Sequence, residues 1–168
     1  MNGKEVPMPI LAKLKEVLDS GKISYEVYNH PLAFTAQEIA AMQHVPGREL
    51  AKVVILKVDG SFVMAVLPAS WLVSFEKVRA GLEATEVALA TETEFASLFP
   101  GCEIGAMPPF GNLFGLPVYV DPELEKDEAI FFNAGNHQQM VRLRYSDFKK
   151  LVRPVVLSMT DDSRKRAA

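Results

Sequence analysis

The chain has 168 residues, of which 49% are hydrophobic and 23% are charged, and its formal net charge is −3. These values are typical of one globular domain that can bury a sizeable core. The single cysteine, Cys102, excludes an intrachain disulfide framework, and the negative charge argues against an extended nucleic-acid footprint.

The N-terminus lacks the apolar core of a signal peptide, and no apolar run reaches the ~18 residues that span a bilayer. We therefore expect a cytoplasmic protein without a membrane partner. Residues 1–160 are expected to form one domain. Residues 161–168, which are basic near the tip, are expected to form a flexible tail.

The first half of the chain begins with apolar residues at helical spacing and then becomes rich in β-branched residues. It predicts a helix over residues 9–20 that Gly21 ends, a strand over 23–28, and a short helix after the capping-box spacing Thr35 to Glu38. Strands over residues 51–58 and 61–67 flank Asp59-Gly60, a dipeptide typical of two-residue hairpin turns.

The second half mixes short helices with further strands. It predicts a helix over residues 75–80, a strand over 87–90, and a helix that begins at a second capping box, Thr91 to Glu94. Glycine and proline are too dense over residues 105–115 for a regular element. Strands are expected over residues 116–120, 129–133 and 140–144, followed by a last helix that Ser146 caps.

Strands outnumber helices, and hairpins connect most of them. This order predicts an α+β fold with a mixed, largely antiparallel sheet, curved or barrel-like, and helices packed around it. No regular alternation of strand and helix is present, so a doubly wound fold is not expected.

Three features carry residues suited to chemistry, and the first is Lys52, which opens an apolar strand. A lysine at a strand end is commonly a solvated end. The functional alternative is a partly buried ammonium group that donates to a phosphate or carbonyl oxygen.

The second feature is the loop from Gly105 to Gly111. Its prolines, Pro108 and Pro109, fix φ, and its glycines allow a ligand to approach the backbone. The loop can therefore present its remaining amides and carbonyls rigidly. The alternative is an ordinary crossover loop, in which Met107 and Phe110 pack into the core.

The third feature is the turn Asn133-Ala-Gly-Asn-His137 after a strand. Gly135 and Asn136 suit a tight turn, and His137 is either an acid/base group or a turn histidine bonded to backbone. No histidine or cysteine spacing indicates a metal site, and no phosphate-binding loop or nucleophile elbow is present, so neither a metal nor a cofactor is expected.

These three features, in this order, resemble the YbaK/ProX-type aminoacyl-tRNA deacylases. The match runs over roughly residues 8–153 and includes His30-Pro31 through Thr35. Two positions depart from the common pattern: Ala106 stands where many relatives have a second glycine, and Asn133 stands where serine is frequent. The resemblance implies the fold of the editing domain that is inserted into bacterial prolyl-tRNA synthetases.

The resemblance also implies an activity and its residues. The chain would act in trans and hydrolyse the ester of mischarged tRNA that carries a small amino acid. An aminoacyl-tRNA synthetase is a further expected partner. The alternatives are a non-catalytic tRNA- or synthetase-binding module of the same fold and a hydrolase of small esters. The implied catalytic residues are Lys52, Gly105 and Pro109, and the implied substrate-binding residues are Ala106, Met107, Pro108, Phe110, Gly111, Asn133, Gly135, Asn136 and His137.

Overall fold

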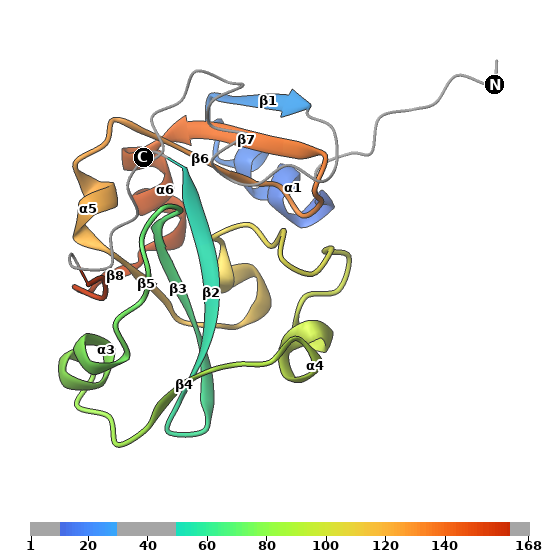
Figure 1. Ribbon diagram of the computed structural model, residues 1–168. Helices are drawn as coiled ribbons and strands as arrows, with labels where there is room; N and C mark the ends of the chain where they lie inside the picture. Colours follow the sequence, from blue (N-terminus) through green and yellow to red (C-terminus); the bar gives the residue numbers. More distant parts are fainter. Residues whose placement is uncertain (1–10, 30–49, 162–168) are drawn as a thin grey trace, which may run out of the picture.

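The computed structural model describes residues 11–29 and 50–161. Two sheets run across one another, with helices packed around them (Figure 1). In chain order the elements are α1 (Ala12–Ser20), β1 (Tyr25–Asn29), β2 (Ala51–Val58), β3 (Ser61–Pro68), α3 (Phe75–Gly81), β4 (Val87–Leu89), α4 (Glu92–Phe95), the 3-10 helices η2 (Ala96–Leu98) and η3 (Gly111–Phe114), β5 (Val118–Val120), α5 (Pro122–Glu125), β6 (Ala129–Asn133), β7 (Gln139–Arg144), α6 (Tyr145–Val152) and β8 (Val155–Val156).

The strands form a three-stranded sheet in the order β1-β7-β6 and a five-stranded sheet in the order β4-β2-β3-β5-β8. The first sheet is antiparallel, whereas β5 pairs in parallel with both β3 and β8. A parallel bridge between Leu50 and Phe131 joins the two sheets at the start of β2. The expected α+β fold is confirmed, but two joined sheets replace the one expected sheet.

The β2–β3 hairpin follows directly from the sequence. Asp59 and Gly60 both have positive φ, 49° and 84°, as a two-residue turn that matches the strand twist requires. The register pairs Val58 with Ser61 and Lys52 with Leu67. The turn therefore sets which residues of β2 share a face with which residues of β3.

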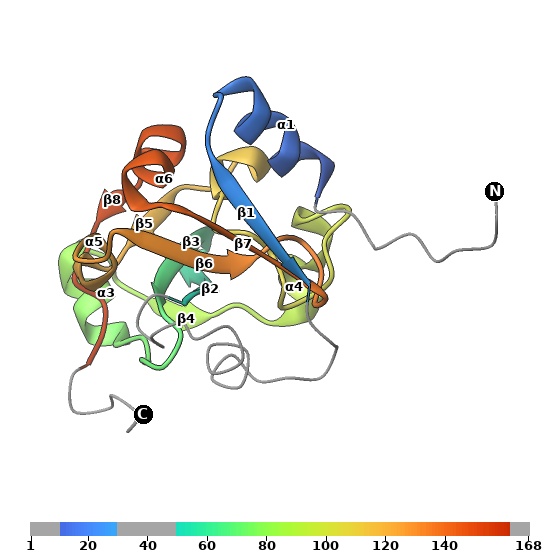
Figure 2. The same cartoon turned by 90° about the horizontal axis from the view of Figure 1, so that it is seen from above.

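Alternate residues of the sheets face different cores. The main core packs the inward faces of both sheets against α1 and α6, which lie on the same side of the three-stranded sheet (Figure 2). A second cluster, around Trp71 and Met159, covers the other face of the five-stranded sheet. Ala51, Val53 and Ile55 belong to the main core, so Lys52 projects from the opposite face of β2.

Most of the expected elements within the described residues are confirmed, and Gly21 ends α1 as predicted. The role of Ser146 is wrong: α6 begins at Tyr145, and Arg144 holds the N-cap position without a side-chain cap. Because β7 continues into α6 without a loop, the N-cap position falls on Arg144, whose guanidinium has no acceptor for a helix amide. No element was expected at α5, β8 or the 3-10 helix at Gly111–Phe114, although Asp121-Pro122 is a helix-start signal for α5. The helix expected after Thr35 lies outside the described residues.

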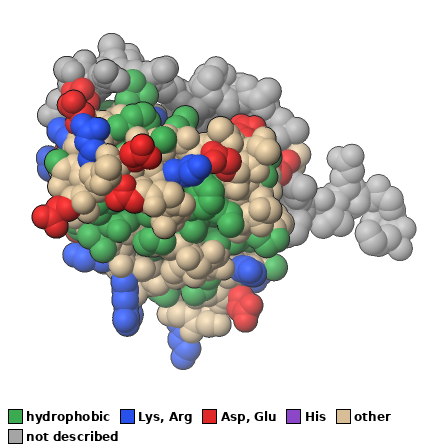
Figure 3. Space-filling model, turned by 90° about the horizontal axis from the view of Figure 1, so that it is seen from below, with side chains coloured by type: hydrophobic (Ala, Val, Ile, Leu, Met, Phe, Trp, Pro, Cys, Tyr) green, Lys and Arg blue, Asp and Glu red, His purple; other side chains and the backbone are tan. Residues whose placement is uncertain are grey.

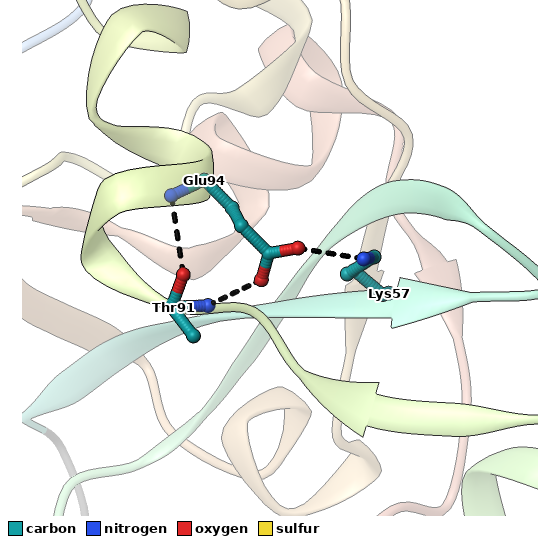
Figure 4. Close-up of polar contacts among 3 residues, drawn as sticks. All are labelled: Lys57, Thr91 and Glu94. Atoms are coloured by element: carbon teal, nitrogen blue, oxygen red, sulfur yellow. Dashed lines mark hydrogen bonds and ion pairs between the residues drawn. The ribbon is translucent and has the colours of Figure 1, made fainter.

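The capping box at the start of α4 is confirmed (Figure 4). The Thr91 hydroxyl accepts from the Glu94 amide at 3.2 Å, and the Glu94 carboxylate accepts from the Thr91 amide at 2.9 Å. Lys57 of β2 donates to the other Glu94 oxygen at 2.6 Å. The box therefore starts the helix and also ties it to the five-stranded sheet.

None of the helices in the described ranges is both long enough and apolar enough to cross a bilayer.

Candidate functional site: the end of strand β6

Lys52 lies beside the end of β6. The parallel bridge joins Leu50 to Phe131, and Lys52 and Asn133 each lie two residues beyond it. From the rise of a strand we infer that Lys52 lies level with Asn133. In β6, Ile130, Phe132 and Ala134 belong to the main core. Asn133 therefore projects from the opposite face, as Lys52 does from β2.

We call this surface the Lys52 face. It continues across β7 to β1, because Arg142 pairs in register with both Phe131 and Glu26. Tyr28 and Phe131 contact each other there with ring centroids 5.6 Å apart. The face is formed by Glu26, Tyr28, Leu50, Lys52, Phe131, Asn133, Met140 and Arg142.

The loop and the turn predicted to act together are in direct contact. The Gly135 amide donates to the Ala106 carbonyl at 2.9 Å, and the Glu103 amide donates to the Gly135 carbonyl at 2.8 Å. The Glu103 carboxylate also accepts from the His137 amide at 2.6 Å. Glu103, which the sequence did not single out, thus fastens the loop to the turn at the end of β6.

His137 has a structural partner. Its Nε2 lies 2.8 Å from the Ile104 carbonyl, and because a carbonyl only accepts, Nε2–H donates. This bond fixes the ring against the loop and occupies one ring nitrogen. Of the two interpretations of His137, the geometry supports the turn histidine bonded to backbone.

Two glycines meet strict backbone requirements. Gly105 has a φ of +87° and Gly135 a φ of +101°, which side-chain-bearing residues rarely adopt. A Cβ on Gly135 would also lie 2.9 Å from the Leu11 Cβ. The loop and the turn therefore depend on glycine at these positions for their shape.

Other loop residues pack into the core. Phe110 is fully buried, with its ring centroid 5.7 Å from those of Phe132 and Phe148. Met107 is buried in the same cluster, and a Cβ on Gly111 would meet Val118 at 2.8 Å. These contacts favour the core-packing alternative for Met107 and Phe110. Substrate contact by Ala106, Pro108 and Pro109, all of them buried, remains a prediction.

The turn itself is held by buried amides. Asn136 donates from Nδ2 to the Gln139 side chain at 3.3 Å, and its Oδ1 accepts from the Gln138 amide at 2.8 Å. Gln139 in turn donates to Asn29 of β1 at 3.1 Å. Asn136 thus orders the turn and connects it to the edge strand.

The structure brings the loop and the turn together and places Lys52 two residues beyond the bridge that joins β2 to β6. Sequence reasoning missed Glu103 and the aromatic and charged residues of the Lys52 face. The two-residue period of β6 and β7 was a signal that could have found the face, because it puts Phe131 and Asn133 on one face of β6 and Met140 and Arg142, their partners in register, on the same face of β7.

Comparison with known families gives a match over most of the chain. A family model described as the aminoacyl-tRNA editing domain matches residues 30–151. The chain belongs to the aminoacyl-tRNA editing domain family. The resemblance to YbaK-type deacylases is thereby confirmed, and so is the prediction of an enzyme that hydrolyses aminoacyl-tRNA.

Individual relatives agree with this membership. The multifunctional Ser/Thr-tRNA deacylase ProXp-y of Escherichia coli (strain K12) is 25% identical over 151 residues, which cover 87% of this chain and 90% of the relative. A proline–tRNA ligase of Staphylococcus haemolyticus (strain JCSC1435) is 34% identical over 79 residues, 47% of this chain and 14% of the ligase.

Solved structures share the fold. A hypothetical protein designated APE2540 superposes with a TM-score of 0.79 at 18% identity, over 89% of this chain and 99% of its own. A protein proposed to be a trans-editing enzyme for prolyl tRNA synthetase superposes with a TM-score of 0.77 at 18% identity, over 89% of this chain and 95% of its own. The editing-domain fold is therefore shared at low sequence identity.

Proposed function

We propose that this editing domain acts in trans, in the cytoplasm, on mischarged tRNA that carries a small amino acid. The observation that carries this proposal is the arrangement at the end of β6, where the Gly135 turn is bonded to the Gly105–Ala106 backbone and Lys52 lies level with Asn133. The name of the E. coli relative, which specifies serine and threonine, supports a small substrate.

In this proposal the 3′ ester of the tRNA lies at the end of β6. The ammonium group of Lys52 donates to the ester carbonyl or to the terminal nucleotide. Backbone groups of the Gly105–Pro109 loop hold the amino group of the substrate and a water molecule. The rigid loop excludes larger side chains by shape, because its prolines restrict backbone adjustment.

The attacking group is water, assisted by the free ribose hydroxyl of the substrate. Water adds to the ester carbonyl carbon, the bond to the ribose oxygen breaks, and free amino acid and tRNA are released. Fixed donors stabilise the developing oxyanion, which is worth ~3–4 kcal/mol per donor in other hydrolases. The occupied Nε2 of His137 fits a mechanism that needs no strong protein base.

The test is a deacylation panel in which one tRNA carries alanyl, seryl, threonyl or prolyl ester. We expect hydrolysis of the small esters to fall with side-chain size. The discrimination per methylene should be modest, because a methylene is worth only ~1–3 kcal/mol in such a pocket. Activity should be unchanged by a chelator. Equal rates for all four esters would contradict size selection, and loss of activity on chelation would contradict the metal-free mechanism.

The same panel distinguishes two alternative functions from the proposed one. A non-catalytic module that binds tRNA or a synthetase would release no amino acid from any charged tRNA. A hydrolase of small esters would act equally well on free aminoacyl esters. Dependence on the 3′ adenosine and the acceptor end of the tRNA therefore distinguishes the proposed editing activity from both, and adding a purified synthetase would show whether it is needed as a partner.

A further inference from the structure

A cavity of about 540 Å³ lies at the corner of the three-stranded sheet where β1 begins and β7 ends. Three cationic side chains line it: Lys22, Arg142 and Arg144. Two carboxylates, Glu26 and Asp147, line it as well. The lining therefore carries a positive excess in a protein whose formal net charge is −3.

The charged side chains of this cavity differ in whether they have an ion-pair partner. Arg142 is held by Glu26 at 3.1 Å, and its guanidinium carbon lies 5.8 Å from the centroid of the Phe131 ring. For Arg144 and Lys22, the described part of the chain offers no hydrogen bond or ion pair to another side chain. Two cations of the cavity therefore remain available to an anionic ligand. Of the two carboxylates in the lining, Glu26 is paired with Arg142 and Asp147 is not.

The cavity continues the Lys52 face. Asn133 pairs with Met140, Phe131 with Arg142 and Ala129 with Arg144, so Arg142 and Arg144 lie two and four residues along the sheet from the level of Lys52. These steps correspond to about 7 Å and about 13 Å along a strand. A row of positive groups thus leads from the candidate site to the cavity.

On the face seen from below, acidic and basic side chains are interspersed with hydrophobic ones (Figure 3). A single-stranded nucleic acid carries one phosphate per nucleotide, and phosphates are bound mainly by lysine and arginine. A strand whose end is fixed at Lys52 would bring its next phosphates onto this row.

We propose that the cavity lined by Lys22, Arg142 and Arg144 binds the phosphates of the single-stranded 3′ end of tRNA, while the terminal ester lies at Lys52. This inference rests on the proposed function and adds the path of the nucleic acid to it. Glu26 neutralises the Arg142 guanidinium, which also contacts the Phe131 ring, and Arg144 and Lys22 supply the charge that is not already neutralised.

The test compares Arg144→Gln, Lys22→Gln and the double variant with the matched control Arg79→Gln. Arg79 is an exposed arginine on α3, far from the three-stranded sheet (Figure 1). Binding of uncharged tRNA is measured over a series of salt concentrations. Each single variant should bind about fivefold more weakly. Each should also reduce the slope of log affinity against log salt by about 0.7, the value for one phosphate on a single strand.

Deacylation separates a phosphate contact from a structural or catalytic effect. On charged tRNA the variants should raise KM with kcat unchanged, and on aminoacyl-adenosine, which lacks the preceding phosphates, they should match the wild type. Glu26→Gln, which frees Arg142, should strengthen tRNA binding by about twofold. Variants that bind tRNA like Arg79→Gln, equal losses on both substrates, or no gain from Glu26→Gln would overturn the proposal.

The two proposals fail separately. A wild-type protein that releases no amino acid from charged tRNA contradicts the proposed function, while the binding measurements on uncharged tRNA still decide whether the cavity is the phosphate path. A wild-type protein that deacylates tRNA with variants that bind it normally contradicts the path alone.

Discussion

Lys52 occupies the second position of a strand whose neighbouring residues belong to the main core. Ala51 and Val53 face that core, so the lysine side chain projects to the other side of β2, where it is partly buried. A lysine there contributes little to packing, and its ammonium group can be directed to a substrate oxygen. Substitutions of Lys52 should therefore change the activity of the protein with little effect on its stability.

We expect Lys52→Ala to lower kcat/KM for mischarged tRNA by at least about 100-fold, as the loss of one fixed donor does in other hydrolases. Lys52→Arg should also impair the rate, because a planar guanidinium cannot take the place of an ammonium group. The melting temperature should stay close to that of the wild type. Lys57→Ala on the same strand is the control, since Lys57 binds Glu94 and should affect stability and not the reaction. Near-normal rates in Lys52→Ala would remove it from the mechanism.

Cys102 illustrates a residue that burial makes inert. Burial raises the pKa of its thiol to about 11 from an ordinary value of 9.0, and Lys13 opposes this only weakly. At neutral pH the thiolate is therefore about a hundredfold scarcer than for an exposed thiol. We expect iodoacetamide to modify Cys102 slowly at pH 7.5 in the folded protein and rapidly after unfolding. Fast modification of the folded protein would show that the thiol is exposed and activated.

The helix α4 combines a capping box within its own sequence with an ion pair to the five-stranded sheet. Its capping box is specified within four residues, but the ion pair to Lys57 depends on β2 lying alongside (Figure 4). The Lys57 side chain, together with the Thr91 amide, lowers the pKa of Glu94 to about 2 from its ordinary 4.5. The carboxylate thus favours the folded state in its ionised form.

The sign of this effect gives a pH dependence. Because the pKa of Glu94 is lower in the folded protein, its contribution to stability is complete above about pH 4.5 and is lost as the pH falls toward about 2. Glu94→Gln should therefore destabilise the protein at pH 6 and match it near pH 2, as measured by urea unfolding. Thr91→Ala, which removes the cap alone, should cost about 1 kcal/mol. A constant difference between Glu94→Gln and wild type across this range would exclude the linkage.

At the scale of the whole molecule, the formal net charge of −3 limits how much nucleic acid the protein can hold. Binding along a nucleic-acid backbone depends on many lysine and arginine contacts to phosphates. An acidic editing domain in which three cationic side chains line one cavity is suited to the acceptor end only. The full body of the tRNA should then add little to recognition.

We expect a minihelix that reproduces the acceptor stem and the 3′ end to be deacylated with kcat/KM within about threefold of that for the full tRNA. The measurement uses the same amino acid on both molecules, at one salt concentration. A minihelix that reacts more than about tenfold less efficiently would show that the protein contacts a larger part of the tRNA.

Short-range signals in the sequence are sufficient to predict several of the local elements. The Asp59-Gly60 hairpin, the Thr91 capping box and the strand before the Asn133 turn are confirmed because turn and cap chemistry acts within a few residues. The Ser146 cap was wrong because a strand runs directly into the helix, which depends on how β7 pairs with β6.

Which residues of the candidate site meet depends on contacts between segments that are distant in the chain. Glu103 fastens the loop to the turn 34 residues away, and the bridge from Leu50 to Phe131 sets Lys52 beside Asn133. Whether Phe110 lines a pocket or the core depends on Phe132 and Phe148, which approach it only after folding. Such contacts join segments far apart in the chain, and sequence spacing carries no measure of the distance between them. The residue types of the candidate site can thus be identified from the sequence, whereas their positions relative to one another depend on the fold.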